Sequence, residues 1–84
     1  MFQFPWEEVS GVGDYFTVTK KGGISHTASL LLSVDDDTYT LTIDDDDTME
    51  QIDSVILPVN IGGSQDGAMS AANVYLNLKG YTPA

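Results

Sequence analysis

Carboxylates are the groups in this sequence whose number and spacing most clearly suggest chemistry. Nine of the 13 acidic residues lie between positions 35 and 53, whereas no Lys or Arg lies between positions 22 and 78. Carboxylates gathered in this way can act as acid–base pairs, bind a hard cation, or present a negative surface to a basic partner. The nine residues, which are our candidate partner-binding residues, are Asp35, Asp36, Asp37, Asp44, Asp45, Asp46, Asp47, Glu50 and Asp53.

Metal binding is the first of these possibilities, because Ca²⁺ and Mg²⁺ prefer several oxygen ligands. The block at positions 44–47 does not continue as a calcium loop, since it lacks the glycine at the sixth position and the bidentate glutamate at the twelfth. Neighbouring strands could still bring the two aspartate blocks together and hold a cation loosely. We therefore expect no specific metal site and no cofactor.

Catalysis would need a nucleophile, a base or a pair of unlike carboxyl groups. His26 is the only histidine, and Ser25, Ser29 or Ser33 could be drawn beside it, but nothing in their spacing selects one arrangement. Paired acid–base work requires two carboxyl groups in different environments, whereas consecutive aspartates on a turn are solvated alike. We expect no catalytic residues and a protein that is not an enzyme.

Recognition of a basic partner fits the charge best. The formal charge of −10 disfavours direct binding to nucleic acid, whose affinity comes largely from Lys and Arg, and to anionic membranes. Duplex DNA carries one charge per ~1.7 Å of axis, while strand residues repeat every ~3.3 Å and strands every ~4.8 Å. An acidic sheet can therefore resemble DNA to a basic groove, and this favours mimicry over DNA binding.

The length and composition indicate one small domain. Eighty-four residues, numbered 1–84, leave room for a single core, and the absence of Cys excludes disulfides and thiolate ligands. The opening MFQFPWEE has no positive region or apolar core typical of a signal peptide, and the longest apolar run covers only positions 30–32. We expect a soluble, cytoplasmic protein.

Alternating patterns predict a sheet. In residues 38–43, Tyr39, Leu41 and Ile43 alternate with threonines, which is typical of a half-buried strand. Residues 15–19 predict a strand with Phe16 and Val18 inward, and residues 20–23 predict a glycine-containing hairpin turn. Residues 24–34 suit either a strand or a buried helical turn, and we favour the strand, with residues 35–37 as the turn that follows it.

The second half of the chain alternates between helix and strand signals. Residues 47–50 resemble a helix start, which predicts one or two turns to residue 53 with Met49 and Ile52 inward. Residues 55–61 predict an edge strand or a bulged strand because Pro58 lacks an N–H donor. We expect a loop at 62–67, a helical turn within 68–73, a strand at 74–78 and a tail from residue 80. The fold class is α+β: a mostly antiparallel sheet of about five strands with one or two short helices.

The N-terminal segment combines an aromatic lead with a glycine–aspartate turn. The pattern is carried by Phe4, Pro5, Trp6, Glu7 and Glu8, followed by Gly13, Asp14, Phe16 and Val18. Residues 5–9 could form one helical turn with Pro at its first position. We expect Phe4, Trp6 and Val9 to cap one end of the core, with an exposed aromatic anchor for a partner as the alternative.

This opening resembles that of small phage-encoded accessory proteins. The resemblance covers about the first fifth of the chain; such proteins usually continue with Arg-rich segments, whereas this chain contains no Arg. It implies a viral accessory protein that acts in a bacterial cytoplasm.

Two functions follow from the sequence. The first is an inhibitor or regulator that binds a basic host protein, such as a nucleic-acid enzyme or a defence factor, with mimicry of DNA as one mechanism. The second is a small homo-oligomer that sequesters a small ligand such as a nucleotide signal, or a minor structural protein of a virion. The second is suggested by the aromatic lead, the glycine-rich loop at 62–67 and an outward-facing Leu31.

Overall fold

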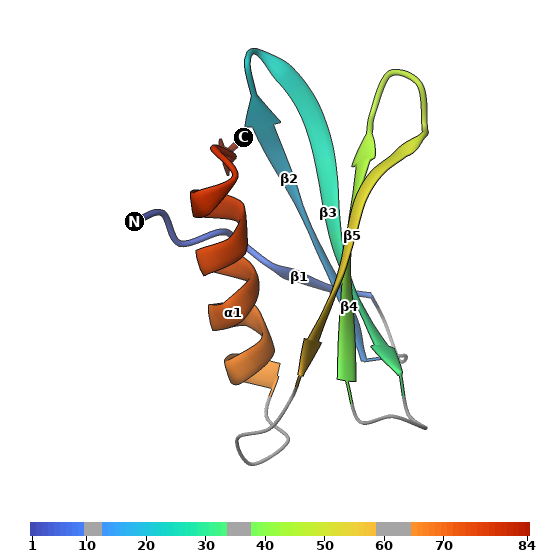
Figure 1. Ribbon diagram of the computed structural model, residues 1–84, viewed down its shortest axis with the longest axis vertical. Helices are drawn as coiled ribbons and strands as arrows, with labels where there is room; N and C mark the ends of the chain where they lie inside the picture. Colours follow the sequence, from blue (N-terminus) through green and yellow to red (C-terminus); the bar gives the residue numbers. More distant parts are fainter. Residues whose placement is uncertain (10–12, 34–37, 59–64) are drawn as a thin grey trace.

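An antiparallel sheet and one helix make up the described part of the chain, and the helix covers one face of the sheet (Figure 1). The computed structural model describes residues 1–9, 13–33, 38–58 and 65–84. This arrangement is the α+β fold that the sequence predicts, with one helix in the described residues. The elements are β1 (Glu7–Val9), β2 (Asp14–Lys21), β3 (Ile24–Ser33), β4 (Thr38–Asp45), β5 (Gln51–Pro58), α1 (Gln65–Leu78) and β6 (Thr82–Pro83).

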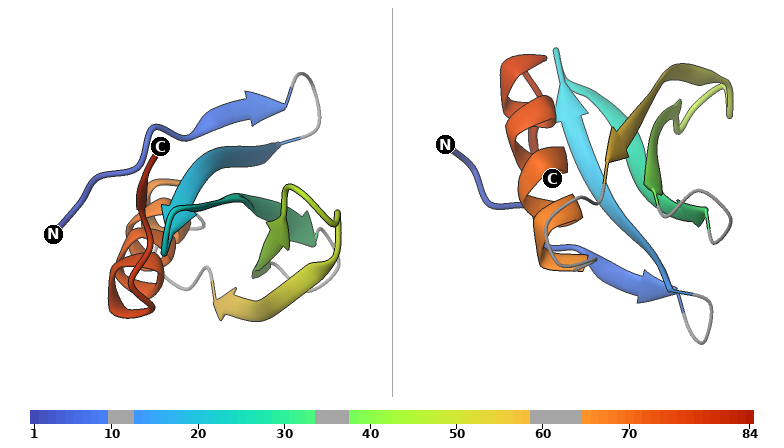
Figure 2. Two further views of the ribbon diagram at one scale, coloured as in Figure 1. Left: turned by 90° about the horizontal axis from the view of Figure 1, so that it is seen from above. Right: turned by 60° about the horizontal axis from the view of Figure 1, so that its bottom comes forward.

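The strands follow one another in chain order. The sheet order is β1-β2-β3-β4-β5, every pair is antiparallel, and β6 pairs with β2 beside β1. Gly22 and Gly23 both have positive φ in the turn between β2 and β3, which confirms the predicted hairpin. β5 lies at the edge of the sheet, as Pro58 predicted. Figure 2 shows that the sheet is strongly twisted, with α1 along one side of it.

The central strands bury the side chains that their alternation predicts. Leu30 on β3 pairs with Leu41 on β4, and both are almost fully buried, as are Ala28 and Ile43. Tyr39 completes this row, so the predicted inward face of residues 38–43 is confirmed, as is the strand interpretation of residues 24–33. We call the buried side the helix face and the opposite side the outer face.

The inward face predicted for residues 15–19 is wrong. The structure buries Tyr15, Thr17 and Thr19, while Val18 is exposed and Phe16 is only half-buried. The register explains the inversion, because Thr17 pairs with the fully buried Ala28 and must share its face. Threonine methyl groups thus fill core positions that apolar alternation alone assigns to other residues.

The C-terminal region is a helix where residues 74–78 predicted a strand. α1 runs through Gln65–Leu78 and buries Ala68, Ala72 and Leu76, which are spaced four residues apart on one helix face. The predicted helical turn at residues 68–73 is therefore part of a longer helix. The helix ends at Leu78, and Gly80, whose φ is 88°, follows it in the left-handed conformation that terminates helices.

The predicted helix at residues 47–53 is also wrong. β4 continues to Asp45, a turn follows, and β5 begins at Gln51. Met49 and Ile52, which were expected to point inward, are 81% and 49% exposed. Met49 has φ 63°, a left-handed conformation that is uncommon outside glycine.

The N-terminal lead is extended where a helical turn was predicted at residues 5–9. β1 pairs with β2, and Phe4 is buried while Trp6 packs against the core from a half-buried position. Val9 is exposed, so only two of the three expected capping residues have that role. Val55 and Leu57 of β5 face the core as predicted, whereas the predicted positions 59–61 and the turn at 35–37 lie outside the described residues. The loop predicted at 62–67 lies outside them in its first half, and it is wrong for residues 65–67, which belong to α1.

Candidate partner-binding surface

The second aspartate block forms the hairpin between β4 and β5. Asp45 N–H donates to the Glu50 carbonyl over 2.9 Å, and Met49 N–H donates to the Asp45 carbonyl over 2.8 Å. The block therefore stands at one end of the sheet, where the turn between β2 and β3 also lies (Figure 1). Its four aspartates have different environments, which the sequence could not distinguish.

Asp45 stabilises the turn itself. Its Oδ1 accepts the backbone N–H groups of Asp47 and Thr48 over 2.8 and 3.2 Å. These bonds to the second and third following residues are the ones an aspartate makes as a helix N-cap, and here they close a turn. The sequence predicted a helix start at residues 47–50, whereas the structure has these bonds at Asp45, in a chain that turns back into β5.

Asp46 joins the hairpin to β3. Ser25 Oγ donates to Asp46 Oδ2 over 2.5 Å, and Thr27 Oγ1 donates to Asp46 Oδ1 over 2.6 Å. The backbone N–H of Asp46 also donates to the Ser25 carbonyl over 3.2 Å. The hydroxyl bonds from Ser25 and then Thr27, together with a smaller attraction to His26, lower the pKa of the Asp46 carboxyl.

Asp53 joins the sheet to the helix. Tyr75 Oη on α1 donates to Asp53 Oδ2 over 2.6 Å, and the Ser54 N–H donates to Asp53 Oδ1 over 2.8 Å. The bond to the carboxylate, with burial adding to it, raises the pKa of Tyr75 to about 12. Asp53 therefore has a structural role on the helix face.

Three acidic side chains remain at the hairpin, and we call them the hairpin surface: Asp44, Asp47 and Glu50. Asp47 and Glu50 are exposed at the tip, and Asp44 is half-buried where β4 pairs with Thr27 of β3. Asp35, Asp36 and Asp37 lie outside the described residues. Thr38 and Asp44 are six residues apart on one continuous strand, which corresponds to ~20 Å. This is the distance along β4 between Thr38, which follows the first aspartate block in the sequence, and Asp44, which begins the second.

The lysines of the chain are engaged mostly with aromatic rings. Lys21 Nζ lies 5.0 Å from the centroid of the Tyr81 ring, and Lys79 Nζ lies 5.5 Å from that of Tyr75. Both distances are within the range of cation–π attraction. These contacts hold two of the three lysine side chains against aromatic rings.

The histidine and the serines proposed as its partners lie on opposite faces of β3. His26 is buried on the helix face, with its ring edge-on to Tyr81 at a centroid distance of 5.4 Å. Ser25 points to the outer face, where its hydroxyl bonds to Asp46, and Ser29 and Ser33 share its alternation. In the described ranges, no three His, Asp or Glu side chains gather as metal ligands would.

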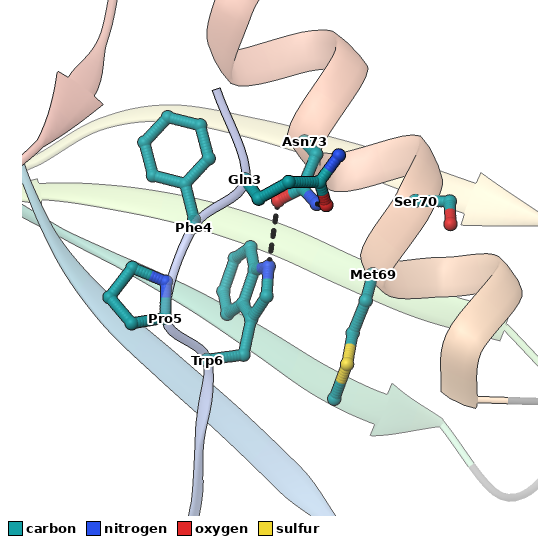
Figure 3. A pocket seen from close by; sticks show the side chains of 7 residues that line it. All are labelled: Gln3, Phe4, Pro5, Trp6, Met69, Ser70 and Asn73. Atoms are coloured by element: carbon teal, nitrogen blue, oxygen red, sulfur yellow. Dashed lines mark hydrogen bonds between the residues drawn. The ribbon is translucent and has the colours of Figure 1, made fainter. Parts of the chain in front are cut away.

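A groove between the N-terminal segment and α1 was missed by sequence reasoning (Figure 3). It is open to solvent and has a volume of about 500 Å³. Trp6 Nε1 donates to Asn73 Oδ1 over 2.9 Å, and Asn73 Nδ2 donates to Gln3 Oε1 over 3.1 Å. Four residues along the helix, Asn77 accepts the Phe2 N–H and donates to the Phe2 carbonyl. The four-residue spacing of the two asparagines was the available signal, and it required the helix to be recognised.

No helix in the part of the chain that the structure describes is long and apolar enough to cross a membrane. Comparison with protein-family models, curated proteins and solved structures finds no match.

Proposed function

We propose that this protein is a non-enzymatic binding protein that uses its acidic hairpin to bind a basic protein. The contact is centred on the hairpin surface, and the other six candidate aspartates contribute to the negative field around it. The target is a basic host protein, such as a nucleic-acid enzyme or a defence factor. Inhibition or regulation of that target, by resemblance to DNA, is the proposed consequence.

The different roles of the acidic residues at and near the hairpin are the observation that carries this proposal. Asp45, Asp46 and Asp53 accept hydrogen bonds that close the turn, join it to β3 and join β5 to α1. The hairpin is thereby fixed in position, while Asp47 and Glu50 are exposed. A rigid element that projects carboxylates, on a chain of formal charge −10, is suited to fast and salt-sensitive association with a basic surface.

The resemblance of the opening residues supports a particular setting. A phage accessory protein would act in the cytoplasm of a bacterial host, where basic nucleic-acid enzymes are abundant targets. The same charge that attracts such enzymes repels DNA and RNA, so direct binding to nucleic acid is not part of the proposal.

The experiment is a comparison of two triple variants that remove equal charge. Asp44→Asn, Asp47→Asn and Glu50→Gln together alter the hairpin surface and leave the aspartates that hold the hairpin. Asp35→Asn, Asp36→Asn and Asp37→Asn form the matched control. Each triple variant raises the formal charge by three, from −10 to −7. Binding is measured by tagged capture from bacterial lysate at low and high salt, with the captured proteins quantified by mass spectrometry.

The proposal predicts one stoichiometric basic protein that wild type retains at low salt and releases at high salt. The hairpin variant should lose it, and the control variant should retain more of it. Unchanged retention by the hairpin variant at low salt would contradict the proposal. Equal weakening of binding in both variants would also contradict it, because binding would then depend on the overall charge and not on the hairpin surface.

An exposed part of the outer face favours a second candidate, a homo-oligomer. Leu31 and Ile56 are 42% and 66% exposed, and both pair with Thr40, so they flank it in one row across β3, β4 and β5. A second copy could cover this row, and the assembly could sequester a small ligand or serve in a virion. The net charge of −10 on each copy opposes this association. Sedimentation at increasing salt tests it, and a monomer at all salt concentrations would contradict it.

A further inference from the structure

The groove beside Trp6 has two walls of different origin. Trp6 comes from the N-terminal segment and Met69 from α1, and Figure 3 shows their side chains on either side of the opening. The bond from Trp6 Nε1 to Asn73 Oδ1 fixes the position of the indole. Its volume of about 500 Å³ lies within the ~300–1,000 Å³ typical of ligand pockets. The indole is therefore fixed beside a groove that is large enough for a side chain.

The walls suit a flat cation. An indole ring attracts cations through its electron-rich face more strongly than the other aromatic side chains do, and a thioether is soft and adaptable. Gln3 and Ser70 add polar atoms to the lining. A guanidinium group is planar, stacks on aromatic rings and donates several hydrogen bonds, so it matches both the rings and the amide oxygens.

The negative charge of the protein favours a cationic ligand over an anionic one. The residues that line the groove are all uncharged, and Glu7 and Glu8, which follow Trp6 directly, are exposed. With a formal charge of −10 on the chain, an anion such as a nucleotide would meet repulsion and no compensating Lys or Arg in the groove. The chain contains no Arg, so a guanidinium must come from another molecule.

We propose that this groove binds an arginine side chain of the basic protein partner. The inference rests on the proposed function, because that function supplies a partner rich in basic residues. Arg and Trp are the residue types that most often dominate the energetics of protein interfaces. The groove and the hairpin surface are separate, so each can be tested without the other.

The test uses the single tryptophan of the chain as a reporter. The indole N–H of Trp6 gives one resonance in a ¹⁵N-labelled sample, and it belongs to the groove. Wild type is titrated with N-acetyl-arginine methylamide and, separately, with N-acetyl-citrulline methylamide, which has the same shape without the charge. We expect a saturable shift with the arginine derivative and binding about fivefold to tenfold weaker with citrulline.

Two helix variants locate the binding. Met69→Ala removes one wall and should weaken the binding of the arginine derivative, whereas Val74→Ala, at an exposed position of α1 outside the groove, should leave it unchanged. Equal binding of arginine and citrulline, no saturable shift, or equal binding by both variants would overturn the proposal. If Met69→Ala does not fold, the comparison of the arginine and citrulline derivatives on wild type still tests the proposal.

The outcome is distinguishable from failure of the proposed function. The titration contains no partner protein, so an absent shift would remove the arginine site and leave the hairpin contact untouched. A hairpin variant that retains its partner in the capture experiment would remove the hairpin contact even if the arginine derivative binds at Trp6.

Discussion

Replacing Asp46 by Asn should destabilise the fold, whereas the same replacement one residue later should not. Asp46 accepts hydrogen bonds from Ser25 and Thr27 over 2.5 and 2.6 Å, and Asp47 is exposed at the tip of the turn. Both replacements remove one charge from the same block, so any general relief of repulsion is shared. The difference between the two variants therefore measures the junction of the hairpin with β3.

The magnitude follows from the two bonds. A hydrogen bond to a charged group contributes ~1.5–3 kcal/mol when buried. Asp46 is half-buried, and an asparagine retains one acceptor oxygen, so we expect Asp46→Asn to cost about 1–2 kcal/mol. Asp47→Asn should change the free energy of unfolding by less than about 0.5 kcal/mol. Urea denaturation at neutral pH compares both variants with wild type.

The pH dependence gives the same test a second form. The pKa of Asp46 is lowered in the folded state, so its contribution to stability is present above the unfolded value of ~3.9 and is lost as the pH falls through the folded value. The cost of Asp46→Asn should accordingly shrink as the pH falls below ~4. Equal stability of Asp46→Asn and Asp47→Asn at neutral pH would refute the reasoning.

Three further predictions concern stability. Thr17→Val should be neutral or stabilising by up to about 1 kcal/mol, because the buried Thr17 hydroxyl has no hydrogen-bond partner. Thr19→Val should instead cost about 1 kcal/mol, because the Thr19 hydroxyl donates to a backbone carbonyl. Equal effects of the two replacements in urea denaturation would contradict this. Met49→Gly should stabilise by about 0.5–1 kcal/mol by relieving the positive φ, which the same assay would detect, and destabilisation would refute this account of the turn. Tyr75→Phe should cost about 1 kcal/mol at neutral pH by removing the bond to Asp53. Because the pKa of Tyr75 rises from 10.0 to about 12 on folding, wild type should also lose stability as the pH rises between those values. A loss of equal size in the variant over this pH range would contradict the assignment.

The central sheet could be predicted from the sequence because only one alternation in residues 38–43 is apolar. Tyr39, Leu41 and Ile43 alternate with threonines, and a single register buries them all. β2 could not be predicted in the same way, because each of its two faces offers an aromatic ring and a branched side chain. The pairing of β2 with β3 determines which face of β2 is buried, and the residues of β2 alone do not specify that pairing.

The two errors in the second half of the chain have different causes. Residues 47–50 predicted a helix start, but the capping bonds are made by Asp45, and they close a turn because the chain then pairs as β5 with β4. In residues 74–78 an apparent alternation concealed a helix whose buried face is built from Ala68, Ala72 and Leu76. Small residues give a weak hydrophobic signal, so the helical period was easy to overlook.

The candidate site was predictable only as a concentration of charge. Composition showed that residues 35–53 are acidic, but it could not separate Asp46 and Asp53, which hold the fold, from the exposed Asp47 and Glu50. That separation depends on which strand residues lie beside each carboxylate. The groove at Trp6 depends on contacts between the two ends of the chain, which no local pattern contains.

The capture experiment with the two triple variants tests the central claim most directly. The hairpin variant changes Asp44, Asp47 and Glu50, and the control variant changes the three aspartates at positions 35–37, with the same final charge of −7. Our account predicts a salt-released basic protein that wild type binds stoichiometrically and that the hairpin variant loses more completely than the control. Full retention by the hairpin variant at low salt would contradict it.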